Sequence, residues 1–253
     1  MSARSLARDP LLWSSLALVA LVLLMPLAKP IFAALFPALE RPMFELDSVA
    51  DLLVGHLVLV GASSAAAILI GVGAGVFVTR RAGAEFRSLV ETIVTIGQTF
   101  PPVAVLAVAV PVIGFGFDPA FIALLLYGLL PIVDNTIAGI GSVPRGLREA
   151  ARGMGMGEGA LLRKLELPLA APVIIAGIRT SVIINVGTAA VASTVGARTL
   201  GLPIIIGLNG ANLAYILQGA IPVALLAIVL DLAFGRLLTL VRKHDTDSAR
   251  PGR

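Results

Sequence analysis

The stretch "EAARGMGMGEGALLRKLELP", residues Glu149 to Pro168, lies between two long apolar runs and carries acidic and basic side chains along its length. Strong helix formers occupy both of its ends, and glycines at alternate positions separate them. Towards the end, Leu161, Leu162 and Leu165 recur at helical spacing beside charged residues, which indicates a short amphipathic helix. We therefore predict two short helices joined by a turn, with Gly155 as a left-handed cap.

Two interpretations of this segment are open. Most charged loops between spans are solvated connectors, and most connections are roughly two to eight residues long. The loop at 143–168 is longer, and Pro168 disfavours a helical conformation at Leu167 while it can open the next helix in its first turn. A rigid helix–turn–helix at the cytoplasmic surface suits a docking element for a cytoplasmic partner better than a slack connector.

The composition places this loop in an integral membrane protein. The chain has 253 residues, of which 58% are hydrophobic and 13% charged, whereas soluble domains carry about 25% charged residues. It contains no cysteine, which excludes disulfides, thiol catalysis and thiolate metal sites. No zinc-protease, P-loop, nucleophile-elbow or dinucleotide motif occurs. We therefore expect a protein that is not an enzyme and that holds no metal and no cofactor.

Six apolar runs are long enough to cross a membrane, since a span needs about 20 residues. They cover about 11–28, 52–79, 88–113, 119–142, 169–195 and 213–240. Most of the 19 basic residues precede the first run, follow the second, lie between the fourth and fifth, or close the chain. By the positive-inside rule, both termini and the loop at 143–168 are cytoplasmic. The prediction is one all-α membrane domain over residues 1–253, with its core at 51–240 and a flexible tail at 242–253.

The first run and the external segment after it carry further signals. The first run lies behind basic residues as a signal peptide would, but no small-x-small cleavage site follows, so we interpret it as a retained helix. The external segment at 29–50 contains three prolines and is predicted not to form one helix. Ser48 and Asp51 have the spacing of a capping box, which marks the start of the second helix.

The charged loop also resembles a known signature. The pattern EAAxxxG, nine residues, then an aliphatic residue, any residue, Leu and Pro is similar to the cytoplasmic-loop motif of ABC importer permeases. The resemblance implies a coupling helix that docks on a cytosolic ABC ATPase, with ATP hydrolysis on that separate subunit. The residues it implies for ATPase coupling are Glu149, Ala150, Ala151, Met154, Gly155, Leu165 and Pro168.

The resemblance extends over about 51–235. Stretches such as "GQTFPPVAVLA", "LYGLLPIVDNTIAGI" and "VGARTLGLPIIIGLNGANLAYILQGAIPVALLAIVLDLAFG" are similar to permeases of osmoprotectant importers, which carry glycine betaine, choline or carnitine. This implies the type I ABC importer fold in a bacterial cytoplasmic (inner) membrane, with six transmembrane helices and transport by alternating access. It further implies a second permease subunit, identical or paralogous, and an extracytoplasmic substrate-binding protein, but no nucleic acid.

Two alternatives to this function stay open. The first is an importer permease for another small solute, such as methionine or a sulfonate. The second is a stand-alone secondary transporter, which has no need of a docking helix and usually shows repeat symmetry that this chain lacks. Aromatic cages hold quaternary ammonium groups, but aromatic residues make up only 5% of the chain and their spacing indicates no cage.

Polar residues within the apolar runs are costly in lipid and are therefore functional candidates. Gln98 and Thr99 precede a pair of prolines, Pro101 and Pro102, which removes helix hydrogen bonds in mid-span. Broken helices often line transport paths, although a packing kink is the alternative. The candidates for a translocation path are Gln98, Thr99, Asn135 and Asn185.

Other residues within the runs are given structural roles. Arg179 needs a partner, and a buried ion pair with Glu149, Asp134 or Asp231 is favoured over substrate contact. Asp134 is expected to reach interfacial water. His56 is interpreted as a packed or lipid-interface residue.

Small residues mark two regions of close packing. Gly71, Gly73 and Gly75 give the second helix a small face. The external "LPIIIGL" run is too short to span and is expected to fold back against the protein. Its glycines Gly201 and Gly207 are candidates for an outer gate or for contact with the binding protein.

Overall fold

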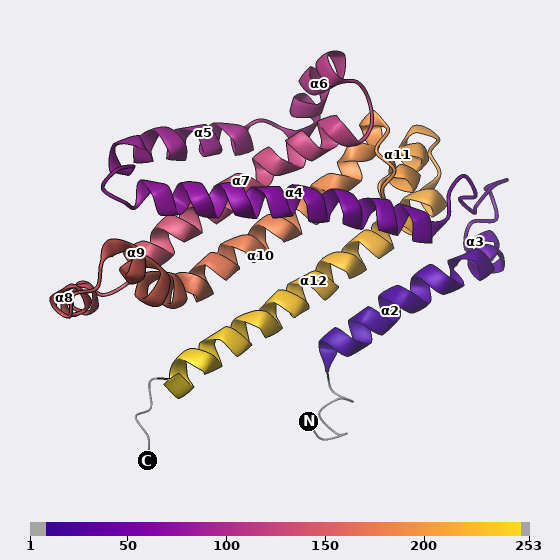
Figure 1. The fold of residues 1–253 in the computed structure, drawn as a ribbon. Coiled ribbons are helices and arrows are strands. Elements are labelled where there is room, and N and C mark those ends of the chain that lie inside the picture. The colour runs from indigo at the N-terminus through magenta and orange to yellow at the C-terminus, as the bar shows by residue number, and fades with distance from the viewer. Residues whose placement is uncertain (1–8, 249–253) are drawn as a thin grey trace. The chain divides into compact units, whose positions relative to one another are not determined.

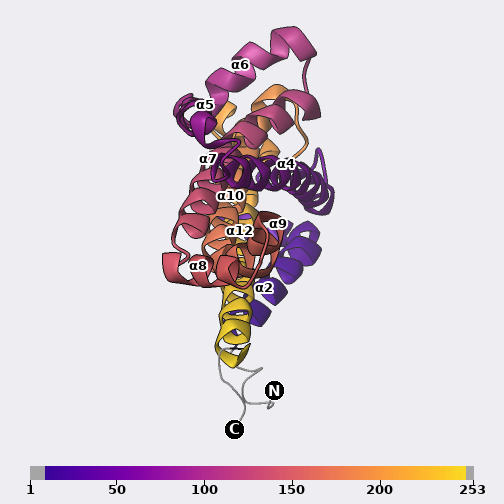
Figure 2. The same cartoon turned by 60° about the vertical axis from the view of Figure 1, so that its left-hand side comes forward.

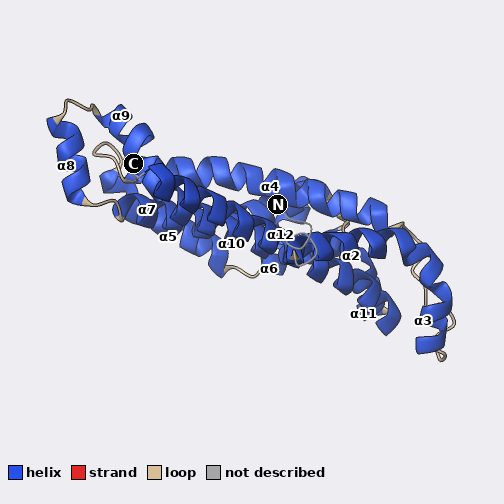
Figure 3. Cartoon of the chain, turned by 90° about the horizontal axis from the view of Figure 1, so that it is seen from below, coloured by secondary structure: helices blue, strands red, loops and turns tan. Residues whose placement is uncertain are grey.

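The computed structural model describes residues 9–248, which form helices, turns and loops without a strand (Figure 3). The helices follow one another along the chain as labelled in Figure 1. They are α2 (Pro10–Leu24), α3 (Lys29–Leu35), α4 (Val49–Val78), α5 (Arg87–Thr99), α6 (Pro102–Ile113), α7 (Phe117–Gly141), α8 (Arg145–Gly153), α9 (Glu158–Leu161), α10 (Leu167–Val191), α11 (Leu202–Asn209) and α12 (Leu213–Ser248). The predicted all-α class is confirmed.

Within the described residues, 5 helical segments are long and apolar enough to cross a membrane. They are Pro10–Leu35, Val49–Val78, Phe117–Gly141, Glu158–Val195 and Leu213–Val241. The third predicted run is instead two helical segments, Ala84–Thr99 and Pro102–Ile113, with a break between them. Pro101 is extended at the break (φ −57°, ψ 138°), because the proline pair lacks the N–H groups that would continue the helix. The described residues therefore contain six candidate spans if the two segments together cross the membrane as one span, and five if they do not.

The chain divides into two compact units, which are described separately. The first comprises the described residues up to Ser64 together with Phe100–Leu125 and Ile183–Ala233. The second comprises Ala65–Thr99, Leu126–Val182 and the described residues from Phe234 onwards.

In the first unit, the external segment after α3 is irregular, as predicted, and is tied to α12 by one buried side chain. Gln218 accepts a hydrogen bond from the Phe44 N–H at 3.0 Å and donates one to the Pro42 carbonyl at 2.8 Å. The capping box is also confirmed. The Asp51 N–H donates to Ser48 Oγ at 3.0 Å, and Ser48 Oγ donates to the Asp51 carboxylate at 2.6 Å, so two groups at the start of α4 are satisfied reciprocally.

In the second unit, α4, α7 and α10 pack closely where small residues meet larger ones. A Cβ atom at Gly71 would lie 2.8 Å from the Ile132 side chain, and one at Gly75 would lie 2.6 Å from Thr136. These two glycines confirm the predicted small face on α4. Gly73 has open space around it and takes no part in this packing. Such close approach of backbones is the usual way in which helices associate in a membrane.

The start of α10 departs from the prediction. Leu167 is helical (φ −63°, ψ −45°), and α9 continues into α10 through a single π-turn at Leu162–Glu166. The Leu167 N–H donates to the Leu162 carbonyl across this turn. A π-turn accommodates Pro168, which has no N–H to donate, without ending the helix. The second helix of the charged loop is therefore the first part of the following span, and its predicted independence is wrong.

The helices near the two ends of the chain are longer than predicted. The first helical segment continues to Leu35, beyond the predicted end at 28. Helix α12 continues to Ser248, so 242–248 is helical where the sequence predicted the start of a flexible tail. The rest of that predicted tail, 249–253, lies outside the described residues.

Candidate coupling site

Helix α8 is the first half of the charged loop and lies beside α9 in both Figure 1 and Figure 2. It begins directly after Pro144, whose extended backbone (φ −58°, ψ 135°) ends the connection from α7. Ala151 is its buried residue. The remaining surface of this short helix consists mostly of exposed side chains, so α8 presents one face to the surroundings and little to the protein core.

Helix α8 ends in a Schellman motif. The Met156 N–H donates to the Ala151 carbonyl at 3.0 Å, and the Gly155 N–H donates to the Arg152 carbonyl at 2.9 Å. Gly155 has φ +83°, which confirms the predicted left-handed cap. These bonds satisfy carbonyls that the helix end leaves unpaired, and they fix the direction in which the chain turns.

The residues predicted for ATPase coupling fall into two groups. Glu149, Ala150, Met154 and Gly155 are exposed on α8 and its cap, and the Met154 exposure is 78%. Ala151 is 4% exposed and packs inward. Leu165 and Pro168 lie on the π-turn and on the first turn of α10. The structure therefore gathers the first part of the sequence motif on one short helix and assigns its last part to the start of a span.

Beneath α8, Glu166 makes two ion pairs that the sequence did not indicate. Its Oε2 accepts from Arg80 Nη1 at 2.6 Å, and its Oε1 lies 2.9 Å from Arg148 Nε. The Glu166 side chain is 3% exposed, and the arginines are 23% and 21% exposed. The sequence offered Glu166 only as one of the charged residues beside Leu161, Leu162 and Leu165, and amphipathic spacing assigned those charged residues to a solvated face.

A second ion pair in this region is solvated. Arg152 Nε donates to Glu158 Oε1 at 3.0 Å, with the two side chains 48% and 61% exposed. The hydrogen bond to Glu158 raises the pKa of Arg152. Both ion-pair groups line a cavity of about 360 Å³. Its charged lining residues are Arg80, Arg81, Arg87, Arg148, Arg152, Glu158 and Glu166.

The four candidates for a translocation path are distributed over both units. Three belong to the second unit. Gln98 donates to the Tyr127 carbonyl at 3.3 Å, Thr99 to the Thr95 carbonyl at 2.8 Å, and Asn135 to the Pro131 carbonyl at 2.8 Å. Thr99 is exposed, whereas Gln98 and Asn135 are half-buried.

Asn185, the fourth candidate, belongs to the first unit and is fully buried. Its Nδ2 donates to Ser64 Oγ at 3.1 Å, and its Oδ1 has no hydrogen-bond partner within the described part of the chain. His56 is buried in the same unit, with Nε2 at 3.1 Å from the Val186 carbonyl. The interpretation of His56 as a packed residue is therefore confirmed.

The charged residues Asp134 and Arg179 are both in the second unit. Asp134 is exposed on α7. Arg179 is half-buried on α10, and its guanidinium would lie 4.0 Å from a Cβ at Gly235 on α12. The predicted roles of both residues stay predictions.

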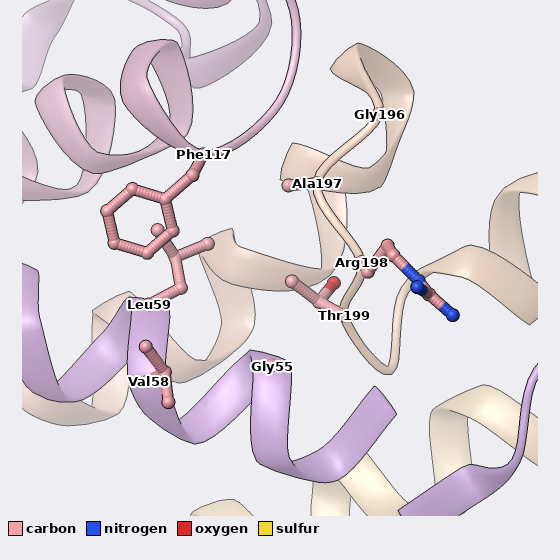
Figure 4. Close-up of a pocket in the computed structure, with 8 residues that line it drawn as sticks. All are labelled: Gly55, Val58, Leu59, Phe117, Gly196, Ala197, Arg198 and Thr199. Atoms are coloured by element: carbon pink, nitrogen blue, oxygen red, sulfur yellow. The ribbon is translucent and has the colours of Figure 1, made fainter. Parts of the chain in front are cut away.

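The first unit contains a separate pocket of about 370 Å³, drawn in Figure 4. Figure 4 shows Leu59 of α4 beside the Phe117 ring, Val58 on the same helix below it, and the loop at 196–199 on the other side of the pocket. The Arg198 side chain points away from the ring, and its guanidinium pairs with Asp47. The lining is mainly apolar, and none of the four path candidates belongs to it.

The external run after this loop folds back as predicted. A Cβ at Gly207 of α11 would lie 2.7 Å from the Asn212 carbonyl oxygen and 2.8 Å from the Ile216 side chain of α12. A Cβ at Gly201 would overlap the carbonyl of Ala190. Both glycines are therefore required for close approach. Their proposed roles in an outer gate or in contact with a binding protein stay predictions.

Known proteins are similar to this chain in sequence and in fold. Residues 67–244 match the family described as "Binding-protein-dependent transport system inner membrane component". The osmoprotectant import permease protein OsmY of Salmonella typhimurium is 45% identical over 187 residues, which are 73% of this chain and 79% of the relative. The choline transport system permease protein OpuBB of Bacillus subtilis is 47% identical over 165 residues, or 65% and 75%.

A solved structure of the MetNI methionine ABC transporter in an inward-facing conformation is 25% identical, with a TM-score of 0.68. The match covers 76% of this chain and 95% of that one. These similarities, together with the exposed and capped helix α8, show the family. The chain belongs to the binding-protein-dependent transport system inner membrane components, the multi-pass permeases of ABC importers.

Proposed function

We propose that this chain is the permease subunit of an ATP-driven importer for osmoprotectants such as glycine betaine, choline or carnitine. Cytosolic ABC ATPase subunits dock on α8, a second permease subunit completes the path, and an extracytoplasmic binding protein delivers the substrate. The names of relatives that are 45% and 47% identical support the substrate class. Alternating access, driven by displacement of α8, is the expected mechanism.

The observation that carries the docking assignment is the form of α8. It is a nine-residue helix with one buried residue, and its end is fixed by a hydrogen-bonded cap. A solvated connector has no need of such a cap. Small Ala150 permits close approach of a partner, exposed Met154 is adaptable at an interface, and Glu149 offers a charged anchor.

The sequence supports placing ATP hydrolysis on another subunit, because no P-loop motif occurs in the chain. A permease that leaves substrate selection to an external binding protein also has no need of an aromatic cage. The low aromatic content is consistent with that division of labour. Gln98, Thr99, Asn135 and Asn185 are proposed to contribute to the path, with the two helical segments that meet at Pro101 as its broken element.

Co-purification with the ATPase, measured beside uptake of labelled glycine betaine, tests this function. Gly155→Asp and Glu149→Lys are expected to abolish both ATPase binding and uptake. Each variant has a control that makes the same type of substitution at another position. Gly157→Asp introduces a favourable helix N-cap residue in the same loop, and Glu85→Lys reverses an exposed charge in another loop.

Retention of both activities in Gly155→Asp and Glu149→Lys would contradict the docking assignment. Uptake by the chain alone, without an ATPase, would favour a stand-alone transporter. Competition by methionine or a sulfonate, with none by choline or carnitine, would overturn the proposed substrate class and leave the importer assignment in place.

A further inference from the structure

Glu166 is unusual among the charged residues of this chain because it is buried. Within the described residues, the charged side chains in the buried class are Asp9 and Glu166. Asp9 caps α2 by accepting from the Leu11 N–H. Glu166 instead lies at the end of the π-turn that leads into a long apolar helix. Burial of a carboxylate is costly unless it is paired, so the position of Glu166 needs a reason.

The two arginines that pair with Glu166 come from different parts of the second unit. Arg80 follows the end of α4, and Arg148 lies in the middle of α8. Each arginine uses a different carboxylate oxygen. Arg80 is further fixed by hydrogen bonds from its Nε and Nη2 to Thr79 Oγ1 at 3.2 and 3.1 Å. One side chain just before α10 therefore links the end of α4, the middle of α8 and the start of α10.

Arg148 is the principal polar link between α8 and the helices beneath it. Besides its ion pair with Glu166, it donates from Nη2 to the Ile140 carbonyl in the last turn of α7. Ala151, the buried residue of α8, adds only a small apolar side chain to this packing. The Arg152–Glu158 pair on the same helix is exposed to solvent. Arg148 therefore offers a direct route by which a displacement of α8 can reach α7 and α10.

We propose that Glu166 is a positioning residue that couples α8 to the span α10, with Arg148 and Arg80 as its two partners. The proposal rests on the proposed function, in which an ATPase moves α8. Arg80 Nη1 holds the carboxylate by a hydrogen bond, whereas Arg148 Nε lies 2.9 Å from it as an ion pair without a hydrogen bond. Attraction between opposite charges in a partly buried space resists separation of α8 from α10, whereas a small apolar contact such as that of Ala151 resists it weakly. Arg80 holds the opposite side of the carboxylate, so α10 and the end of α4 move together.

Without the negative charge of Glu166, two guanidinium groups would face each other across a partly buried space. Repulsion between them would separate α8 from the end of α4, while the outer face of α8 that meets the ATPase would be unchanged. The distinctive result is therefore a complex that still assembles and hydrolyses ATP but transports less substrate for each ATP consumed. A residue with a merely structural role would lower assembly, hydrolysis and transport together.

The experiment compares wild type, Glu166→Gln, Glu166→Asp and the control Glu158→Gln in the complete importer reconstituted with its ATPase and binding protein. Co-purified ATPase, ATP hydrolysis and uptake are measured on each preparation. Glu166→Gln should retain the ATPase but lower uptake per ATP by about tenfold, which is within the usual range of coupling effects. Glu166→Asp, which keeps the charge, should recover part of the loss, and Glu158→Gln should match wild type.

Wild-type uptake per ATP in Glu166→Gln would overturn the proposal. If Glu166→Gln does not assemble, Arg148→Lys decides, because it keeps the charge but loses the geometry of the guanidinium. Reduced uptake per ATP in the assembled Arg148→Lys complex supports the coupling role, and a wild-type ratio rejects it. If the wild-type chain itself retains no ATPase, the proposed function fails, and this result is distinct from a failure at Glu166.

Discussion

The loop around α8 and the loop before α11 are held to the protein by different forces. On the α8 side, Glu166 is paired with Arg80 and Arg148, and these ion pairs link the end of α4, the middle of α8 and the start of α10. On the α11 side, Gly55 and Gly201 press directly against backbone carbonyls, and Thr199 donates to the Ala189 carbonyl at 2.8 Å. Ion pairs can be weakened by degrees, whereas backbone contact leaves no room for an added atom. Substitutions should therefore impair coupling in the first loop and folding in the second.

The largest effect on folding is expected at Gly201. A methyl group there would overlap the Ala190 carbonyl, which cannot move without distorting α10. Gly201→Ala should lower the free energy of unfolding by about 3 kcal/mol, at the upper end of ordinary overpacking costs. Thermal unfolding in detergent measures the loss. Gly187→Ala, on α10 with open space around it, is the matched control. Equal midpoints for the two variants would remove the distinction between the loops.

Glu166→Gln should have a smaller effect on stability than Gly201→Ala. The arginines it leaves are 23% and 21% exposed, so water can solvate them in part. We expect a loss of about 1–2 kcal/mol, below the cost of breaking a fully buried pair. The same thermal unfolding measurement applies. A loss larger than that of Gly201→Ala would mean that the ion pairs, and not the glycine contacts, dominate folding.

Gly155→Ala tests the cap with the least possible change. Space for a Cβ is available, but φ +83° is strained for alanine. The expected cost is about 1 kcal/mol, confined to the end of α8. Hydrogen exchange at the Met156 N–H should therefore accelerate while the spans stay protected. Gly157→Ala, with φ −70°, should leave this exchange rate unchanged. Faster exchange at the Met156 N–H in both variants would mean that any substitution in the turn destabilises it, and that the effect is not specific to Gly155.

The smallest effect is expected for Arg152→Gln, which removes the exposed pair with Glu158. Surface ion pairs contribute little and are screened by salt. Neither the unfolding midpoint nor uptake per ATP should change measurably, at low or at high ionic strength. A change comparable with that of Glu166→Gln would show that exposure does not separate the two pairs, and the comparison would lose its physical basis.

Much of this architecture is predictable from local signals. The apolar runs indicate the helices, the Ser48–Asp51 spacing indicates the start of α4, and Gly155 indicates the end of α8. Each of these depends on residues within a few positions of one another. The break in the third apolar run was predictable, since the proline pair marks its position.

The contacts that join distant segments were not predictable. Glu166 pairs with Arg80, which is 86 positions away, and helical spacing alone gave Glu166 a solvated face. The π-turn shifts the register of the helix just before Pro168, so the side chains there do not point where a regular helix would direct them. The spacing of residues along a helix predicts which of them lie on the same face, but it does not predict which segment packs against that face.

The most direct test of the coupling account uses the absence of cysteine from the chain. Met154→Cys introduces one thiol on the exposed end of α8, and Ala82→Cys introduces one in another exposed loop. The rate of maleimide labelling is measured for the permease alone and with its ATPase bound. The account predicts strong protection at position 154 and none at position 82. Equal labelling at position 154 with and without bound ATPase would contradict docking on α8.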